Sequence, residues 1–208
     1  MLKIAKFIVG TMGTNCYFLI DESTSKAAVV DPGAECEKIL EKLAARGLTC
    51  EKILLTHGHF DHIMALEELR EATKAPVYIH GADAELLSDP EKSYMRQFAG
   101  ISASCRAPEV TLSEGDSVSI GSQTMTVLHT PGHTQGSVCY DDGEHLICGD
   151  TLFKGGMGRY DLYGGDFATL TQSLRRIAEL PGDRSIYPGH GMSGTLSSER
   201  ENNMYLYL

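Results

Sequence analysis

The sequence has no hydrophobic run that approaches the roughly 20 apolar residues of a membrane-spanning helix. Its first residues also lack the pattern of a signal peptide, because Gly10 and Gly13 interrupt a short apolar run before a cleavage site could form. No Cys-x-x-Cys pair occurs among the six cysteines, whose neighbours are mostly apolar. We therefore expect a cytoplasmic protein that makes no membrane contact and whose thiols are reduced and buried.

Basic residues are the scarcer class of charged residue. Lys and Arg number 18 against 28 Asp and Glu, which gives a formal net charge of -10 at pH 7. This excess of negative charge opposes binding to nucleic acid and to anionic membrane surfaces. A small-molecule substrate is therefore the favoured partner, and the sequence leaves the oligomeric state open.

Length and composition are typical of one soluble globular domain. The chain has 208 residues, of which 42% are hydrophobic and 22% are charged. No segment has the composition of a linker, so we predict a single domain over residues 1–208.

The first half of the chain alternates between strand and helix patterns. Its first thirty residues contain three strand-like runs, LKIAKFIV, NCYFLID and KAAVVD. Between Ala34 and Arg46 the apolar residues recur with a helical period that stops at Gly47. We then expect a short strand over 53–55, a second helix marked by Ile63, Leu66 and Leu69, a strand over 77–80 and a short helix over 82–87.

The second half repeats this arrangement after a polar stretch through Pro90 and Gly100. Four strand-like runs follow Pro108, namely SVSI, MTVLHT, SVCYD and HLICG. A third helix over 170–178, a strand SIY and a polar C-terminal segment complete the chain. Two sheets with helices on their outer faces would bury both patterns, so we predict an α/β fold, a four-layered αββα sandwich, rather than a doubly wound parallel sheet.

The segment ILLTHGHFDH places four ligand-type residues, His57, His59, Asp61 and His62, directly after a short apolar strand. Residues two apart in an extended loop point the same way, so His57 and His59 can bind one metal ion while Asp61 and His62 reach another. A polar surface loop is the alternative, but four ligand types within six positions are rare by chance. We therefore predict a pair of metal sites.

Three further candidate ligands follow other strands. VLHTPGH ends at His133, SIYPGH ends at His190, and Asp150 follows HLICG. Alone, each would more often be a turn residue, but Gly132 and Gly189 allow sharp turns that hold an imidazole in place. The carboxylate of Asp150 can bridge two cations with its two oxygens.

With these residues the chain resembles the metallo-β-lactamase superfamily and, within it, the glyoxalase II-like hydrolases. Other matching segments are Asn-Cys-Tyr at 15–17, Asp-Pro-Gly at 31–33, GDTLF at 149–153, GRYD at 158–161 and Glu-Arg at 199–200. The resemblance implies that His57, His59 and His133 hold the first metal, that Asp61, His62 and His190 hold the second, and that Asp150 is shared. One departure is Met64-Ala65, where the family has two small residues, and another is the absence after His190 of the helical extension that helps full glyoxalase II to hold glutathione.

The resemblance predicts a dinuclear metal hydrolase acting on ester or thioester bonds, with Asp61 and Asp150 in catalytic roles. The favoured activity is a glyoxalase II-type thioesterase, which cleaves S-acyl thiols such as S-lactoylglutathione with a metal-bridging hydroxide. A thioester suits a site without an evident general acid, because a thiolate leaves without obligatory protonation. Two divalent ions are implied, zinc by preference, with iron or manganese as alternatives.

Two other hypotheses stay open from the sequence, and nuclease or β-lactamase activity stays possible but has no support in it. Persulfide dioxygenases share the HxHxDH and GRxD elements but use a single iron, bound by the equivalents of His57, His133 and Asp150, in an oxidoreductase reaction. A metal-binding domain without turnover is the third hypothesis, which the complete ligand set argues against.

Several residues outside the predicted ligand set have expected roles in substrate contact, ligand support or packing. Arg159 and Tyr160 are candidate substrate contacts, although Arg159 could equally form a structural salt bridge. Asp31 is expected to support a ligand rather than to bind metal. Cys148 is expected to be a buried thiol, and the remaining histidines, His80, His129 and His145, are expected to be ordinary strand-end or surface residues.

Overall fold

Strand β2 (Thr14–Asp21) shows why this chain forms stacked layers. All eight of its residues are buried in the computed structural model, which describes residues 2–208. Because side chains alternate across a strand, Cys16 and Phe18 pack against helices, whereas Tyr17 and Leu19 pack against a second sheet. A strand buried on both faces therefore needs a helical layer on one side and a sheet on the other.

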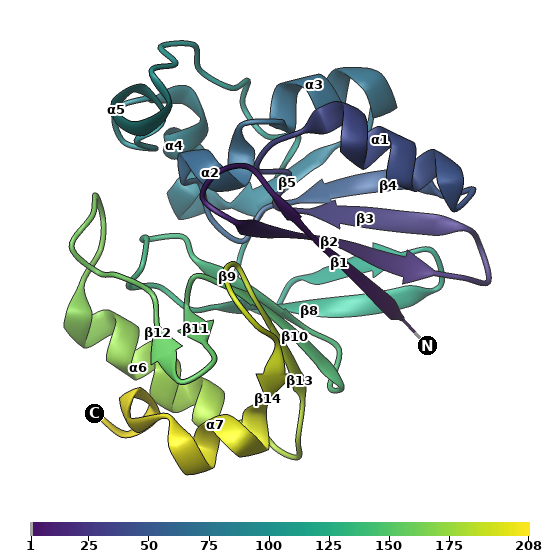
Figure 1. Cartoon of the computed structure of the whole chain (residues 1–208). Helices are drawn as coiled ribbons and strands as arrows, with labels where there is room; N and C mark the ends of the chain where they lie inside the picture. Colours follow the sequence, from purple (N-terminus) through teal and green to yellow (C-terminus); the bar gives the residue numbers. More distant parts are fainter. Residues whose placement is uncertain (1) are drawn as a thin grey trace.

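The first sheet has the strand order β1-β2-β3-β4-β5-β6. Strands β1 to β3 pair antiparallel and β3 to β6 pair parallel. Helices α1 and α3 pack on its outer face through Ile39, Leu43, Leu66 and Leu69 (Figure 1). The bounds are β1 (Lys3–Val9), β3 (Lys26–Val30), β4 (Thr49–Leu54), β5 (Val77–His80), β6 (Val110–Leu112), α1 (Cys36–Ala45) and α3 (Leu66–Thr73).

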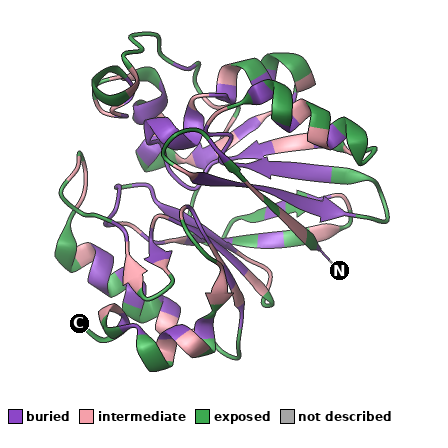
Figure 2. Cartoon of the chain, viewed as in Figure 1, coloured by how far each residue is buried: buried purple, intermediate pink, exposed green. Residues whose placement is uncertain are grey.

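The second sheet has the order β14-β13-β10-β9-β8-β7, in which only β10 and β13 are parallel. Leu170, Leu174 and Ile177 of α6 pack on its outer face against Leu146 and Cys148. Buried residues therefore fill three interfaces of the sandwich (Figure 2), and the predicted αββα arrangement is confirmed. The bounds are β7 (Ser117–Ile120), β8 (Gln123–His129), β9 (Val138–Asp141), β10 (His145–Gly149), β13 (Ser185–Pro188), β14 (Gly194–Thr195), α6 (Phe167–Ala178) and α7 (Leu196–Asn202).

Short elements account for the differences from the sequence prediction. The predicted second helix is two helices, because the Ala65 N–H donates to the Pro32 carbonyl at 3.0 Å instead of continuing the first helix. Helices α5 and α7 lie in stretches where no helix was predicted, since each is too short to show a clear period. The remaining elements are α2 (Phe60–Ile63), η1 (Gly81–Asp83), α4 (Ala84–Ser88), α5 (Met95–Ala99), β11 (Leu152–Phe153), β12 (Gly156–Met157) and η2 (Met204–Tyr207).

The fold can be compared with what the sequence predicts for the cysteines and for membrane-spanning segments. All six cysteines are buried. Across residues 2–208, no helix combines the length and the apolar character needed to cross a membrane.

Candidate metal centre

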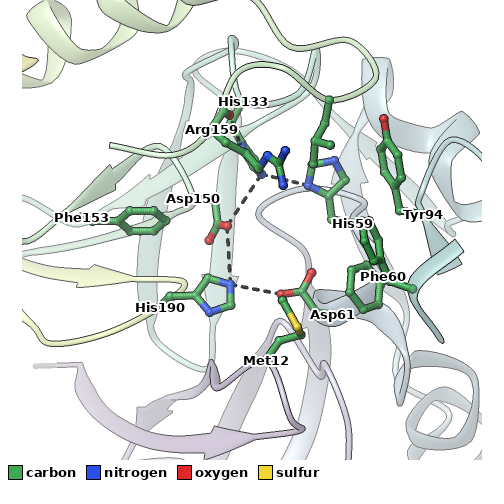
Figure 3. A pocket seen from close by; sticks show the side chains of 12 residues that line it. Met12, His59, Phe60, Asp61, Tyr94, His133, Asp150, Phe153, Arg159 and His190 are labelled. Carbon is green, nitrogen blue, oxygen red and sulfur yellow. Dashed lines mark hydrogen bonds and ion pairs between the residues drawn. The ribbon is translucent and has the colours of Figure 1, made fainter. Parts of the chain in front are cut away.

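The seven predicted metal ligands come together where strands of both sheets end. Figure 3 shows Asp61, His190 and Asp150 linked by dashed lines beside His133 and His59. The seven are His57, His59, Asp61 and His62 from the segment after β4, His133 from the β8–β9 loop, Asp150 after β10 and His190 after β13.

Three imidazoles form the first candidate metal group. Nδ1 of His59 lies 2.9 Å from Nε2 of His133, which lies 3.2 Å from Nε2 of His57. Nδ1 of His133 donates to the Arg159 carbonyl at 2.7 Å, and Nδ1 of His57 lies 3.0 Å from the Thr56 hydroxyl. Such partners set the tautomer and aim the lone pair of the other ring nitrogen at a metal. These three nitrogens could hold one ion.

Asp61, His62 and His190 form the second candidate group. Nε2 of His190 lies 3.1 Å from Oδ2 of Asp61, and Nε2 of His62 lies 3.7 Å from the same oxygen. Nδ1 of His62 donates to Oδ2 of Asp31 at 3.0 Å, which leaves its Nε2 free for a metal. This contact fits the supporting role that the sequence predicts for Asp31.

Asp150 lies between the two groups. Its Oδ1 is 3.5 Å from Nε2 of His62, and its Oδ2 is 3.5 Å from Nε2 of His190. The same Oδ2 is 3.7 Å from Nε2 of His133. One carboxylate therefore reaches imidazoles of both groups, which is the geometry of a shared ligand.

Buried atoms without partners show that the residues fit cations. Within residues 2–208, Nε2 of His62 and Oδ1 of Asp150 are buried and make no hydrogen bond. A buried polar atom left unpaired costs about 1–3 kcal/mol, so such atoms need an explanation. Both point toward the shared centre, where a metal ion would satisfy them. Imidazole and carboxylate donors suit zinc, iron or manganese.

Burial keeps the first group in the form that binds metal. Burial, followed by the neighbouring imidazoles, lowers the pKa of His57 and His59 well below the ordinary value. Burial also lowers the pKa of His133. These three rings are therefore neutral near pH 7, and neutral imidazole is the metal ligand.

The second group attracts positive charge. Burial lowers the pKa of His62, but Asp61, Asp150 and Asp31 outweigh burial and raise that pKa to about 10. Burial raises the pKa of Asp61, yet His62 and His190 together hold it below its ordinary range. A divalent ion would satisfy the same carboxylates and replace the proton on His62.

The two Pro-Gly-His segments need glycine for different reasons. Gly132 has a φ of +127°, which L side chains rarely adopt. Gly189 lies outside that region, but a Cβ there would lie 2.1 Å from Oδ1 of Asp150 and 2.8 Å from Cε1 of His62. The sequence predicts a sharp turn at both glycines, whereas at Gly189 the requirement is space beside two ligands.

Strand β2 supports the second group. The Thr14 hydroxyl donates to Oδ2 of Asp61 at 3.1 Å. The Tyr17 hydroxyl donates to the Pro188 carbonyl at 2.6 Å, which anchors the segment that carries His190. A strand of the first sheet thus holds ligands that belong to both sheets.

Asp83 is a supporting residue that the sequence analysis missed. Its buried carboxylate accepts hydrogen bonds from the Gly58 N–H at 3.0 Å, the Gly136 N–H at 2.6 Å and the Thr134 hydroxyl at 2.7 Å. Burial raises its pKa to about 6 despite these donors, which leaves it ionised at neutral pH. Gly58 lies within the His-Gly-His segment and Thr134 follows the third imidazole, so one carboxylate joins both parts of the first group. No local pattern marks it, because these partners are distant in sequence.

Asp83→Ala is expected to lower the free energy of unfolding by about 2–4 kcal/mol, because buried donors from two loops lose their acceptor. Urea unfolding of chelator-treated protein measures this effect without a contribution from bound metal. Asp166→Ala is the matched control: its carboxylate caps a helix at the surface, and its loss should cost about 1 kcal/mol. A loss at Asp83 no larger than that of the control would contradict the role.

A cavity of about 360 Å³ lies beside the two groups and is lined by five of the candidate ligands (Figure 3). Arg159 also lines it. The remaining lining residues are mostly apolar, namely Met12, Phe60, Tyr94, Phe98, Phe153 and Leu162.

Only one of the two predicted substrate contacts lines this cavity. The Arg159 guanidinium does so, but its Nε and Nη2 bind the Asp161 carboxylate at 2.8 Å and 2.9 Å. Tyr160 lies outside the lining, and its ring packs against Phe167 with centroids 4.9 Å apart. A contact between Tyr160 and substrate stays a prediction from the sequence.

The other histidines and Cys148 lie outside the metal groups. His80 and His129 stack on each other with ring centroids 4.0 Å apart, and His145 lies 2.9 Å from the Asp142 carboxylate. Burial raises the pKa of the Cys148 thiol well above its ordinary value, which makes it a poor nucleophile.

The αββα sandwich with a His and Asp cluster at its strand ends defines the class of protein. Residues 9–190 match the Metallo-beta-lactamase superfamily, and the chain belongs to this superfamily. Over 209 residues it is 39% identical to the probable metallo-hydrolase YqgX of Bacillus subtilis, covering 99% of this chain and 98% of that protein. Over 196 residues it is 30% identical to the hydroxyacylglutathione hydrolase GloC of Haemophilus influenzae, covering 92% of each.

Solved structures show the same fold. The B3 metallo-beta-lactamase BLEG-1 matches with a TM-score of 0.93 and 35% identity, covering 99% of this chain and 100% of that one. TTHA1623 in a di-iron-bound form matches with a TM-score of 0.87 and 36% identity, covering 97% of this chain and 100% of that one. ETHE1 from Myxococcus xanthus matches with a TM-score of 0.79 and 30% identity, covering 97% of this chain and 83% of that one.

Proposed function

We propose that the protein is a dinuclear metal-dependent thioesterase of glyoxalase II type, which hydrolyses S-acyl thiols such as S-lactoylglutathione. The observation that carries the proposal is the position of Asp150, whose two oxygens face imidazoles of both ligand groups. A carboxylate in that position is what a paired metal site requires. Similarity to GloC, named as a hydroxyacylglutathione hydrolase, supports the thioester as the bond that is cleaved.

Each ligand group would hold one ion, and Asp150 would contact both. When bound, two divalent cations lower the pKa of a coordinated water and polarise a substrate carbonyl. Thr14 and His190 contact Oδ2 of Asp61, which leaves Oδ1 to accept a hydrogen bond from the attacking water and to orient it. The leaving thiolate needs no protein proton, because its parent pKa is about 8.5.

We propose zinc as the metal, with iron and manganese as alternatives. The donor set of imidazole nitrogens and carboxylate oxygens accepts all three, so availability decides between them. The di-iron-bound form of TTHA1623 makes iron the alternative with structural support.

A second candidate function is oxidation of a persulfide. The HxHxDH and GRxD elements that the chain shares with persulfide dioxygenases favour it. That reaction would need one iron held by His57, His133 and Asp150, with Asp61 and His190 left without a metal. Nε2 of His62, which is buried and makes no hydrogen bond within residues 2–208, instead supports a second occupied group.

Metal content and oxygen consumption separate the two functions. Purified protein is expected to contain close to two metals per chain and to release free thiol from S-lactoylglutathione without consuming oxygen. An oxygen electrode with glutathione persulfide, run on the same preparation, is the parallel assay. One iron per chain together with oxygen uptake in that assay would overturn the hydrolase proposal.

A further inference from the structure

One side of the cavity is a continuous aromatic surface. Phe60 of α2 stacks on Phe98 of α5, with ring centroids 5.4 Å apart and an interplanar angle of 25°. Tyr94 lies 5.8 Å from Phe98 and meets the candidate ligand His59 edge to face at 5.9 Å. We call Phe60, Tyr94 and Phe98 the aromatic wall. It extends from the first metal group to the mouth of the cavity.

The backbone holds this wall in place. Tyr94 has a φ of +63°, which is unusual for a bulky residue and persists only where the surroundings enforce it. Its hydroxyl accepts a hydrogen bond from the Tyr163 N–H at 2.9 Å, which ties α5 to the loop on the other side of the cavity. The wall is therefore positioned by the fold in the absence of substrate.

Apolar side chains remain exposed at the cavity mouth. Phe98 is 54% exposed and Met12 is 56% exposed, and both line the cavity. Covering such surface stabilises a complex by roughly 25 cal/mol per Å² of apolar area removed from water. A ligand that covers both side chains would gain from burial without forming a hydrogen bond.

Cationic groups are scarce in the cavity. Among the lining residues of the described chain, Arg159 is the only Lys or Arg. Two of its nitrogens already bind Asp161, so a substrate carboxylate would have to compete with that ion pair. Glutathione carries two carboxylates, and away from the metal groups the lining offers at most one cationic side chain for them.

We infer that the substrate carries an uncharged apolar group about the size of a phenyl ring, which packs on the aromatic wall, and that recognition of glutathione carboxylates adds little. The inference rests on the proposed thioesterase function and names its substrate class. The apolar group belongs either to the acyl half or to the thiol half of the thioester.

Three comparisons against one reference substrate, S-acetyl-N-acetylcysteamine, test this inference. S-phenylacetyl-N-acetylcysteamine changes only the acyl half, S-acetyl benzyl mercaptan changes only the thiol half, and S-acetylglutathione adds charge. We measure kcat/KM for each, corrected for the rate of hydrolysis by hydroxide. One of the two apolar substrates is expected to exceed the reference by roughly tenfold or more, and that substrate identifies the half that meets the wall. S-acetylglutathione is expected to stay within about threefold of the reference.

Phe98→Ser tests whether the wall causes the preference. It should remove most of the apolar gain, measured as the ratio of kcat/KM for the apolar substrate to kcat/KM for the reference substrate in the same protein. Tyr207→Ala is the matched control, since Tyr207 is 64% exposed and lies outside the cavity lining. The inference is overturned if neither apolar substrate exceeds the reference by threefold, or if the gain survives in Phe98→Ser.

A binding measurement separates this inference from the thioesterase proposal. The neutral fluorophore N-phenyl-1-naphthylamine should bind wild type and Tyr207→Ala and bind Phe98→Ser at least tenfold more weakly. If protein with two metals per chain hydrolyses no thioester, the proposed function fails, whereas the dye still reports on the aromatic wall. Equal dye binding by all three proteins would overturn the inference alone.

Discussion

Asp150→Ala is expected to abolish thioester hydrolysis and to reduce the metal content from close to two ions per chain. The reason is the position of this carboxylate, which faces His62 on one side and His133 and His190 on the other. Loss of a shared ligand weakens both metal groups, so occupancy and activity should fall together. Metal analysis after dialysis, combined with a steady-state assay at saturating zinc, measures both quantities.

The fold should survive this change. Oδ1 of Asp150 makes no hydrogen bond within residues 2–208, so its removal leaves no buried donor without an acceptor there. In the presence of a chelator, Asp150→Ala should therefore still unfold in one cooperative transition with the m value of wild type, and its free energy of unfolding should be lower because protonated His62 loses one of its carboxylates. Full activity with two metals retained would remove Asp150 from the site, and unfolding of the metal-free variant would show a structural role instead.

Asp61→Asn is expected to lower kcat by roughly 10²–10⁴, the range attributed to positioned acid–base groups. The amide keeps the size of the side chain but removes its charge, so it is a weaker metal ligand and a poorer acceptor from the attacking water. KM should change less, because substrate binding depends on the cavity as a whole. The measurement is steady-state hydrolysis by protein whose metal content has been restored and determined.

Asp166→Asn provides the control for Asp61→Asn. It makes the same chemical change at an exposed helix N-cap, where asparagine caps as well as aspartate, so kcat and stability should both be unchanged. If Asp61→Asn keeps kcat within about threefold of wild type at full metal occupancy, Asp61 does not orient the nucleophile and the proposed mechanism is wrong at its central step.

The layer arrangement could be predicted because hydrophobic periodicity is local. The strand runs and the helical period that stops at Gly47 each lie within a few consecutive residues, and the structure places β1 to β3 and α1 there. Helix α5 could not be predicted in this way. It spans only five residues, starts from Tyr94 in a left-handed conformation and exists because its side chains pack against α2.

The candidate ligands could be predicted for the same local reason. Four of them lie within six positions, His133 and His190 each end a Pro-Gly-His segment after a strand, and Asp150 directly follows an apolar strand, so residue type and spacing suffice. Spacing did not reveal Asp83, whose partners at Gly58 and Gly136 lie 25 and 53 residues away. It also could not decide between a substrate contact and a salt bridge for Arg159, whose guanidinium pairs with Asp161.

The sequence by itself therefore determined the layers and the set of ligand-type residues, because both depend on residue type and short-range period. Only the tertiary structure decided how these residues are used. It placed Asp150 between the two ligand groups, joined the ligand loops through Asp83 and built an aromatic wall from α2 and α5. Each of these depends on distances between segments that are remote in the chain, and such distances are set when the two sheets pack together.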